Sequence, residues 1–197
     1  MTEKIDKFRG EHRWLSNFWP ANVSFEGIEY DCVEKAYVAA KFPKEATIEL
    51  KVDGVKTEVN VREYLRDGIN TPGGAKRLGR KAEKAGLLRS DWNEVKLEVM
   101  RQLIAEKFGD KNPHLVVKLL ETGEAELIEG NTWGDTYWGV VTGGRSKSKI
   151  GQGQNHLGKL LMERRTLLRK YFEHLAKPEV KQAVERLKAK GLLENDT

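Results

Sequence analysis

Strict alternation of apolar and polar positions predicts two β-hairpins in the first third of the chain. Residues 22–31 alternate on both sides of Glu26–Gly27. Residues 47–61 alternate in the same way around Asp53–Gly54, and Asp-Gly between two alternating runs is a strong hairpin signal. Because successive side chains of a strand point to opposite faces, each hairpin is expected to keep one face in water.

Apolar positions spaced three and four residues apart predict helices over much of the remaining chain. The predicted helices cover residues 31–42, 75–84, 91–108, 113–122, 156–172 and 178–190. Residues 71–74 contain a proline and two glycines, which are expected to break the chain before the second helix. Residues 124–130 predict a short strand with Leu127 inward, and the glycine-rich residues 131–155 predict a long functional loop.

Length and composition describe a soluble globular protein with one sizeable core. The chain has 197 residues, 39% hydrophobic and 33% charged. Its apolar runs are far shorter than the roughly 20 residues of a membrane span, and its first ten residues lack the apolar run of a secretory signal. The single cysteine, Cys32, excludes an internal disulfide and fits a reducing cytoplasm, where we expect the protein, with no membrane partner. Cys32 is either a small core residue or a nucleophile.

Positive charge is concentrated late in the chain. The net charge of +5 permits an anionic ligand. Residues 143–170 contain eight Lys or Arg residues against one acid, Glu163. Such a segment suits phosphate or a nucleic-acid backbone, and the alternative is a solvated helix face.

The predicted helix 31–42 carries a carboxylate and an amine on one face. Glu34 and Lys41 are seven residues apart, nearly two helical turns, with Tyr37 and Val38 between them. Partial burial raises the pKa of a glutamate and lowers that of a lysine, which suits acid/base or Schiff-base chemistry. The alternative is an ordinary solvated surface pair.

The glycine-rich loop matches neither common nucleotide-binding motif. Gly151 and Gly153 lack the third small residue of the dinucleotide fingerprint, and Leu160 stands where a P-loop needs a hydroxyl. Glycines ahead of the helix that starts at His156 could still present backbone N–H groups to an anion. The four histidines show no metal-ligand spacing, so no metal is expected.

Aromatic residues lie in the irregular segments, where they serve either as core or as stacking platforms for a base. Trp133 and Trp138 flank Asp135 in the long loop. The Asp135 carboxylate either stays ionised beside a developing cation or caps a turn.

Four segments together resemble one known family, the NADAR domain of the YbiA-like N-glycosidases. They are residues 14–18 (WLSNF), 33–37 (VEKAY) with Lys41, the step from Asp135 to Gly139, and the run from Gly153 to Arg165. Residues 71–79 fit the middle of the family, and the resemblance extends from about residue 8 to residue 168. The hairpin at 47–61 departs from the pattern, because a shorter helical connection is expected there; the edge of the site could differ as a result.

The resemblance implies a compact, mostly helical α+β domain with small β-hairpins, over residues 1–175, followed by a C-terminal helical extension over 176–197. It implies hydrolysis of an N-glycosidic bond between a ribosyl phosphate and a base-like amine, without a cofactor. The residues that it places at the site are, for catalysis, Glu34, Lys41 and Asp135 and, for substrate binding, Asn17, Phe18, Tyr37, Trp133, Trp138, Gly139, Gly153 and Asn155.

Three functions are weighed. The basic segment and the charged hairpin favour removal of ADP-ribose from guanine in nucleic acid, as an antitoxin that opposes a toxin ADP-ribosyltransferase of the same system. The second is cleavage of a ribosyl-phosphate small molecule, an early riboflavin-pathway intermediate. The third is a non-enzymatic nucleotide- or nucleic-acid-binding module.

Two mechanisms are open for the enzyme. In one, Glu34 is the acid/base and Lys41, made partly neutral by burial, forms a Schiff base with the opened sugar. In the other, water attacks directly and Lys41 only binds phosphate or the ring oxygen.

Overall fold

The structure is a computed structural model that describes residues 3–145 and 147–189. Its helical segments are η1 (Gly10–Leu15), α1 (Val33–Ala40), α2 (Val61–Asp67), α3 (Pro72–Lys84), α4 (Trp92–Lys107), α5 (Pro113–Glu121), η2 (Lys147–Lys149), α6 (His156–Ala176) and α7 (Pro178–Ala189). Its strands are β1 (Lys4–Ile5), β2 (Pro20–Phe25), β3 (Ile28–Cys32), β4 (Thr47–Val52), β5 (Val55–Asn60), β6 (Glu126–Leu127), β7 (Gly130–Asn131) and β8 (Val140–Val141).

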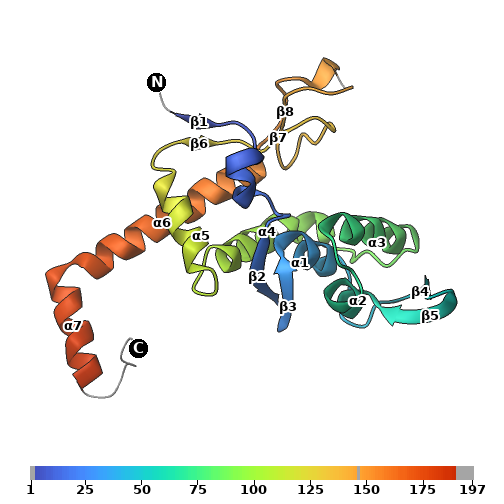
Figure 1. Cartoon of the computed structure of the whole chain (residues 1–197), viewed down its shortest axis with the longest axis horizontal. Helices are drawn as coiled ribbons and strands as arrows, with labels where there is room; N and C mark the ends of the chain where they lie inside the picture. The colour runs from blue at the N-terminus through green and yellow to red at the C-terminus, as the bar shows by residue number, and fades with distance from the viewer. Residues whose placement is uncertain (1–2, 146, 190–197) are drawn as a thin grey trace.

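Helix α1 lies at the centre of the molecule (Figure 1). All of its residues are buried, and it packs against α2, α3 and α4. Small side chains make this packing close. A Cβ atom on Gly79 of α3 would lie 2.7 Å from Val38 Cγ1, so only glycine lets α3 approach α1 this closely.

Both predicted hairpins are present, with their turns at the expected residues. β2 pairs antiparallel with β3 and β4 with β5, and Glu26 and Asp53 adopt positive φ in the two turns. Two short parallel pairs, β1 with β6 and β7 with β8, were not predicted as pairs, although β6 lies within the strand expected over residues 124–130 and its Leu127 is buried as expected. Helices with small strand pairs confirm the mostly helical α+β fold.

Two helix starts differ from the prediction. Residues 71–74 do not break the chain, because Thr71 Oγ1 accepts from Gly74 N at 3.1 Å and Pro72 occupies the first helical turn of α3. Helix α2 was not predicted; Asn60 Oδ1 caps it by accepting from the backbone N–H groups of Arg62 and Glu63.

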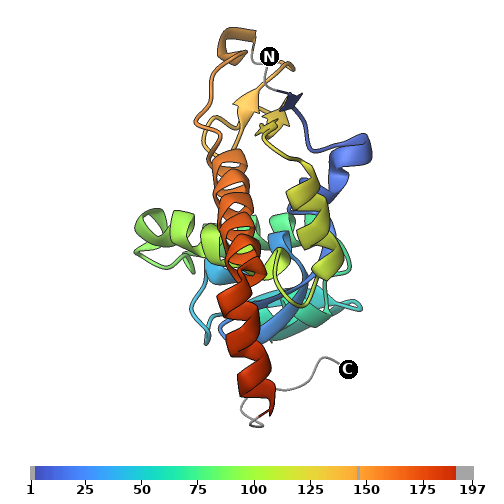
Figure 2. The same ribbon diagram turned by 90° about the vertical axis from the view of Figure 1, so that its left-hand side faces the viewer.

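Helix α6 runs along one side of the domain, and α7 continues away from its end (Figure 2). The two helices are separated at Lys177, next to the expected boundary at residue 175. Whether α7 is an independent extension stays a prediction, and residues 190–197 of that extension lie outside the described part. Among the described residues, no helix is long and apolar enough to cross a membrane.

A buried lysine links α4 to the N-terminal segment. Lys107 Nζ donates to Ser16 O at 2.7 Å, and complete burial lowers the pKa of Lys107 to about 7. This hydrogen bond holds Ser16 against α4. The carbonyl of the next residue, Asn17, accepts from Glu34 N at 3.0 Å. The N-terminal segment is thereby held against both α4 and α1.

Candidate active site

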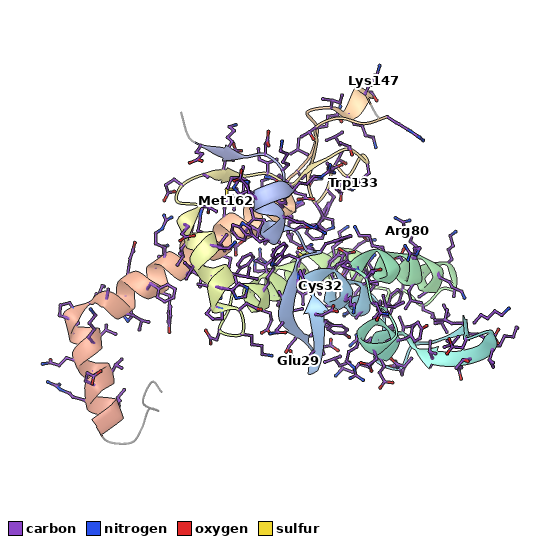
Figure 3. All side chains as sticks on the ribbon, viewed as in Figure 1. Glu29, Cys32, Arg80, Trp133, Lys147 and Met162 are labelled. Carbon is purple, nitrogen blue, oxygen red and sulfur yellow. The ribbon has the colours of Figure 1, made fainter. Side chains whose placement is uncertain are left out.

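A cavity of about 720 Å³ opens between α1 and α3 on one side and the N-terminal segment and the loop around β7 on the other. Figure 3 labels Trp133, on the loop after β7, and Arg80, on α3. Both residues line the cavity. Its size is typical of a small-molecule site. Eight of the predicted site residues line it: Asn17, Phe18, Glu34, Tyr37, Lys41, Trp133, Asp135 and Trp138.

Glu34 lies in the first turn of α1, at the inner wall of the cavity. Its exposed fraction is 6%, and burial raises the pKa of its carboxyl. Lys76 of α3, with Nζ 3.7 Å from Glu34 Oε1, and Lys41 both act in the opposite direction on that pKa. Glu34 and Lys41, which helical spacing was expected to place on one face, both line this cavity, and their catalytic roles stay predictions.

Lys41 follows α1 directly and is paired with an acid. Its Nζ lies 2.7 Å from Glu83 Oε1 of α3 and 5.7–5.8 Å from the ring centres of Tyr37 and Trp92. The sequence analysis considered only burial around the Lys41 amine. The structure adds the carboxylate of Glu83, which contacts the amine directly. Glu83, absent from the predicted site, also lines the cavity and forms this ion pair with Lys41.

An aromatic wall closes the side of the cavity. Trp138 contacts Tyr37 edge-on, with ring centres 5.5 Å apart. Lys76 Nζ lies 4.7 Å from the ring centre of Phe18, and Asn17 Nδ2 contacts Met100 Sδ at 3.5 Å. Of the two roles considered for the aromatic residues, core packing and stacking on a base, Tyr37 and Trp138 take part in the first.

Trp133 is the exception among these aromatics, because its exposed fraction is 59%. The Arg9 guanidinium lies 5.9 Å from its ring centre. The exposed ring is free to stack on a ligand.

Asp135 caps the turn that leads to Trp138. Its Oδ1 accepts from the backbone N–H groups of Tyr137 and Trp138, each at 2.9 Å. One oxygen is therefore used locally, as in an Asx turn. A role in catalysis stays a prediction for this residue.

Glu129 is a cavity residue that the sequence analysis missed. It is half-buried just before β7, and burial, reinforced by the charge of Asp135, raises the pKa of its carboxyl to about 7. Its Oε2 is buried without a hydrogen-bond partner among the described residues. Leaving a buried polar group unpaired costs about 1–3 kcal/mol. The available signal was an acid at the junction of the predicted strand and the glycine-rich loop.

Three predicted substrate-binding residues lie outside the cavity lining and hold the strand that bears Glu129. Asn155 Oδ1 accepts from Glu129 N at 3.0 Å, and Asn155 Nδ2 donates to Leu127 O at 2.9 Å. A Cβ on Gly139 would lie 2.0 Å from Glu129 O, and one on Gly153 2.1 Å from Gly139 O. Direct substrate contact stays a prediction for Gly139, Gly153 and Asn155.

The predicted anion site at the start of α6 is wrong. The backbone N–H groups of Gln154, His156 and Leu157 donate to the carbonyls of residues 136, 137 and 138 at 2.8–3.2 Å. These donors are satisfied within the protein, so they are not available to a phosphate. The same bonds attach the loop that carries Trp138 to α6.

Comparison with known proteins settles the family. The model of the NADAR domain matches residues 6–169. The chain belongs to the NADAR domain family. Membership makes it an N-glycosidase, a hydrolase that breaks N-glycosyl bonds.

Relatives of this NADAR protein fall into two groups. It is 36% identical over 156 residues to "N-glycosidase YbiA" of Escherichia coli (strain K12), covering 78% of this chain and 80% of YbiA. The NMR structure of E. coli YbiA matches with a TM-score of 0.65 and 32% identity over 90% of both chains. "Riboflavin biosynthesis protein VVA0006" of Vibrio vulnificus is 33% identical over 77% of this chain, which spans 34% of that relative.

The positive charges of the cavity do not come from the basic segment at 143–170. None of the lining residues belongs to it except Leu157. Instead Arg164 donates to Phe108 O, Arg165 to Ala125 O and Arg169 to Gly123 O, so three of its arginines hold the fold together.

The cations of the NADAR cavity are Lys41 and Lys76 with three arginines. These are Arg9 and Arg13 of the N-terminal segment and Arg80 of α3, all exposed at the cavity opening. Within residues 3–145 and 147–189 these three arginines form no ion pair. Their guanidinium groups are available to an anion.

Hairpin β4–β5 contributes no residue to the cavity lining, although it was expected to alter the edge of the site. Residues of α3 line the cavity instead. Its charged side chains are two lysines and three carboxylates, at residues 49, 51, 53, 56 and 58. This balance gives no net positive charge for a nucleic-acid backbone. In the described part of the chain, no group of three or more His, Cys, Asp or Glu residues could hold a metal ion.

Proposed function

We propose that this NADAR protein hydrolyses the bond between the anomeric carbon of a phosphorylated ribose and a base nitrogen, with ADP-ribose on guanine in nucleic acid as its substrate. One observation carries the proposal: the cavity has carboxyl groups at its wall and, at its opening, arginines that form no ion pair with any described residue. Glu34 and Glu129 represent the first set and Arg9, Arg13 and Arg80 the second.

This arrangement suits a substrate that becomes positive at one end and is negative at the other. Cleavage of a ribosyl bond develops positive charge at the sugar ring, which carboxylates stabilise. Guanidinium groups bind phosphate oxygens with paired hydrogen bonds. Three unpaired arginines exceed the needs of a single phosphate, which favours a diphosphate, and the exposed Trp133 offers a surface for a base.

Lys41 acts as the nucleophile in the mechanism that we favour. Glu83 takes a proton from the Lys41 ammonium, and the neutral Nζ bonds to the anomeric carbon while the electron pair of the old bond leaves with the base. Nζ passes one proton to water, and Glu34 protonates the ring oxygen as the ring opens, which leaves a protonated Schiff base between Nζ and the anomeric carbon. Water adds to its carbon, the bond to Nζ breaks, and the ribosyl phosphate leaves with Lys41 restored.

Borohydride trapping tests this covalent step. Reduction during turnover should leave a stable sugar adduct on Lys41, and Lys41→Ala should form none and lose most of its activity. Lys44→Ala is the matched control, because this exposed lysine lies outside the cavity and should keep both the adduct and the rate. Absence of an adduct, with Lys41→Ala still active, would support direct attack by water.

A phosphorylated riboflavin intermediate is the second candidate substrate. Relatives named riboflavin biosynthesis proteins in Vibrio vulnificus and Zea mays support it, at 33% and 34% identity. The chain spans 34% and 23% of these relatives, so they contain much that it does not align with. Such an intermediate presents fewer negative charges to the arginines.

Turnover of the two substrates side by side decides between them. We expect release of ADP-ribose from modified guanine DNA to be the faster reaction, and Arg80→Ala to slow it more than cleavage of the riboflavin intermediate. Arg77→Ala is the control on the same helix, because Arg77 is exposed outside the cavity. Faster turnover of the riboflavin intermediate would reverse the assignment, and salt-dependent binding without turnover of either would indicate a binding module.

The antitoxin role follows from the first substrate. A partner transferase that attaches ADP-ribose to guanine would be opposed by this enzyme. Co-expression with such a transferase should restore growth and clear modified guanine from DNA. Lys41→Ala should restore neither, and rescue by that variant would speak against reversal by catalysis.

A further inference from the structure

Glu129 is a cavity carboxyl that the proposed mechanism does not use. It lines the cavity from the residue just before β7, whereas Glu34 lines it from α1. Both line one cavity, and the charge of Lys76 acts on the pKa of both carboxyls. A substrate held between these two carboxyls would have an acid on each side.

The surroundings of the two carboxyls differ. Glu34 has a cation within ion-pair distance, Lys76 at 3.7 Å, whereas Glu129 has none within that distance among the described residues. The charged groups that act on Glu129 are Asp135 of its own loop, Lys76, Arg9 and Lys107. Burial and Asp135 outweigh these cations and raise the pKa of Glu129 to about 7, which keeps a proton on a large share of the molecules near neutrality.

The position of Glu129 is fixed by its backbone. Asn155 accepts from its N–H group, and Val140 N donates to its carbonyl at 2.9 Å. Its Oε2, in contrast, has no partner in the described chain. A rigidly placed carboxyl with an unused oxygen is suited to donate to a group that arrives with the substrate.

We propose that Glu129 is the general acid that protonates the leaving base. As the bond between the anomeric carbon and the base nitrogen breaks, its electron pair goes to the base, and the proton of the Glu129 carboxyl moves to that base. Glu129 is left as a carboxylate and recovers a proton from water once the base departs. Glu34 then serves the ring oxygen alone. This inference rests on the proposed N-glycosidase reaction.

A substrate that needs no proton tests the proposal. Nitrophenolate leaves without protonation, so the nitrophenyl riboside 5-phosphate bypasses a general acid. We expect Glu129→Gln to lose at least about 100-fold in kcat on a base-linked substrate and to keep most of its rate on the nitrophenyl substrate. Glu126→Gln, three residues away and outside the cavity, should match the unaltered enzyme on both.

The pH profile of the unaltered enzyme provides a second readout that does not depend on a variant. Its rate on the base-linked substrate should fall as pH rises above about 7, where Glu129 loses its proton. The rate on the nitrophenyl substrate should lack this fall. The same contrast applies if Glu129→Gln proves unable to fold.

Four results would overturn the inference. Equal losses of Glu129→Gln on both substrates, or no loss on the base-linked one, would exclude proton donation by Glu129 while leaving the enzyme an N-glycosidase. An alkaline fall of the same size with both substrates would exclude it as well. Failure of the unaltered enzyme to cleave any ribosyl substrate would overturn the proposed function and this inference with it.

Discussion

Glu129 couples the chemistry of the site to the stability of the fold. Burial raises the pKa of its carboxyl and so favours the neutral form. Its Oε2 has no hydrogen-bond partner among the described residues. An acid whose pKa is raised on folding stabilises the folded state below its ordinary pKa of 4.5. That contribution is lost as pH rises through its folded pKa of about 7.

Stability should therefore depend on pH through this residue. Between pH 5 and pH 8 the unaltered protein should lose about 2–3 kcal/mol of unfolding free energy relative to Glu129→Gln. Urea unfolding of both proteins at the two pH values measures this difference. Parallel behaviour of the two would mean that Glu129 ionises normally in the fold.

Residues of the site were predictable where one helix places them. Glu34 and Tyr37 lie on α1 and Lys41 is its C-cap residue, still in helical conformation, so helical spacing brings the three together. Glu83 and Glu129 were not predictable, because each reaches the cavity through tertiary contacts between segments far apart in the chain. The arginines at the cavity opening, Arg9, Arg13 and Arg80, were missed for the same reason. The density of positive charge along the sequence predicted residues 143–170 as the anion-binding segment instead.

The loop from β7 to the start of α6 is the element on which the site geometry depends. Its backbone is so closely packed that Gly139 leaves no room for a side chain: the nearest obstacle is Glu129 O at 2.0 Å. A backbone atom cannot move away as the end of a flexible side chain can. The loop is thus a rigid support for Glu129 and Trp138.

Adding one carbon atom at Gly139 should disrupt this support. Gly139→Ala should lower the unfolding free energy by about 1–3 kcal/mol or more, and kcat should fall because Glu129 and Trp138 are displaced. Gly143→Ala in the same loop is the control, since its nearest neighbour would be Thr132 Cγ2 at 3.8 Å. Thermal unfolding and turnover of the two variants provide the comparison, and equal stability would contradict the close packing.

Elements with a clear period were predicted well, and short ones were not. Alternation and Asp53–Gly54 or Glu26–Gly27 defined both hairpins, while spacing defined α4, α5 and α6. The pairs β1–β6 and β7–β8 have two residues per strand, too few for alternation to register. The start of α3 was misplaced because proline and glycine usually end helices, whereas here Thr71 caps one.

At the scale of the whole molecule, helix α7 contributes no residue to the cavity lining. The last lining residue is Leu157, and α7 packs mainly against α6. The NADAR match ends at residue 169, before α7 begins. These facts favour residues 176–197 as an addition to the catalytic domain.

A chain that ends at residue 177 should keep its activity. Surface segments outside the core contribute little, so we expect a loss of less than about 1 kcal/mol in stability and unchanged kcat and KM. Differential scanning calorimetry and turnover check both. A large loss of stability would show that α7 belongs to the domain.

The cavity joins the two ends of the domain, since residues 8–18 and the segment between Glu129 and Leu157 form part of its lining beside α1, α3 and α4. During synthesis the first of these two segments leaves the ribosome long before the second. The start of α6 must then emerge before its N–H groups can hold the loop that carries Trp138. A nascent or truncated chain shorter than about 160 residues would therefore bind no substrate, so the activity should appear only when the domain is nearly complete.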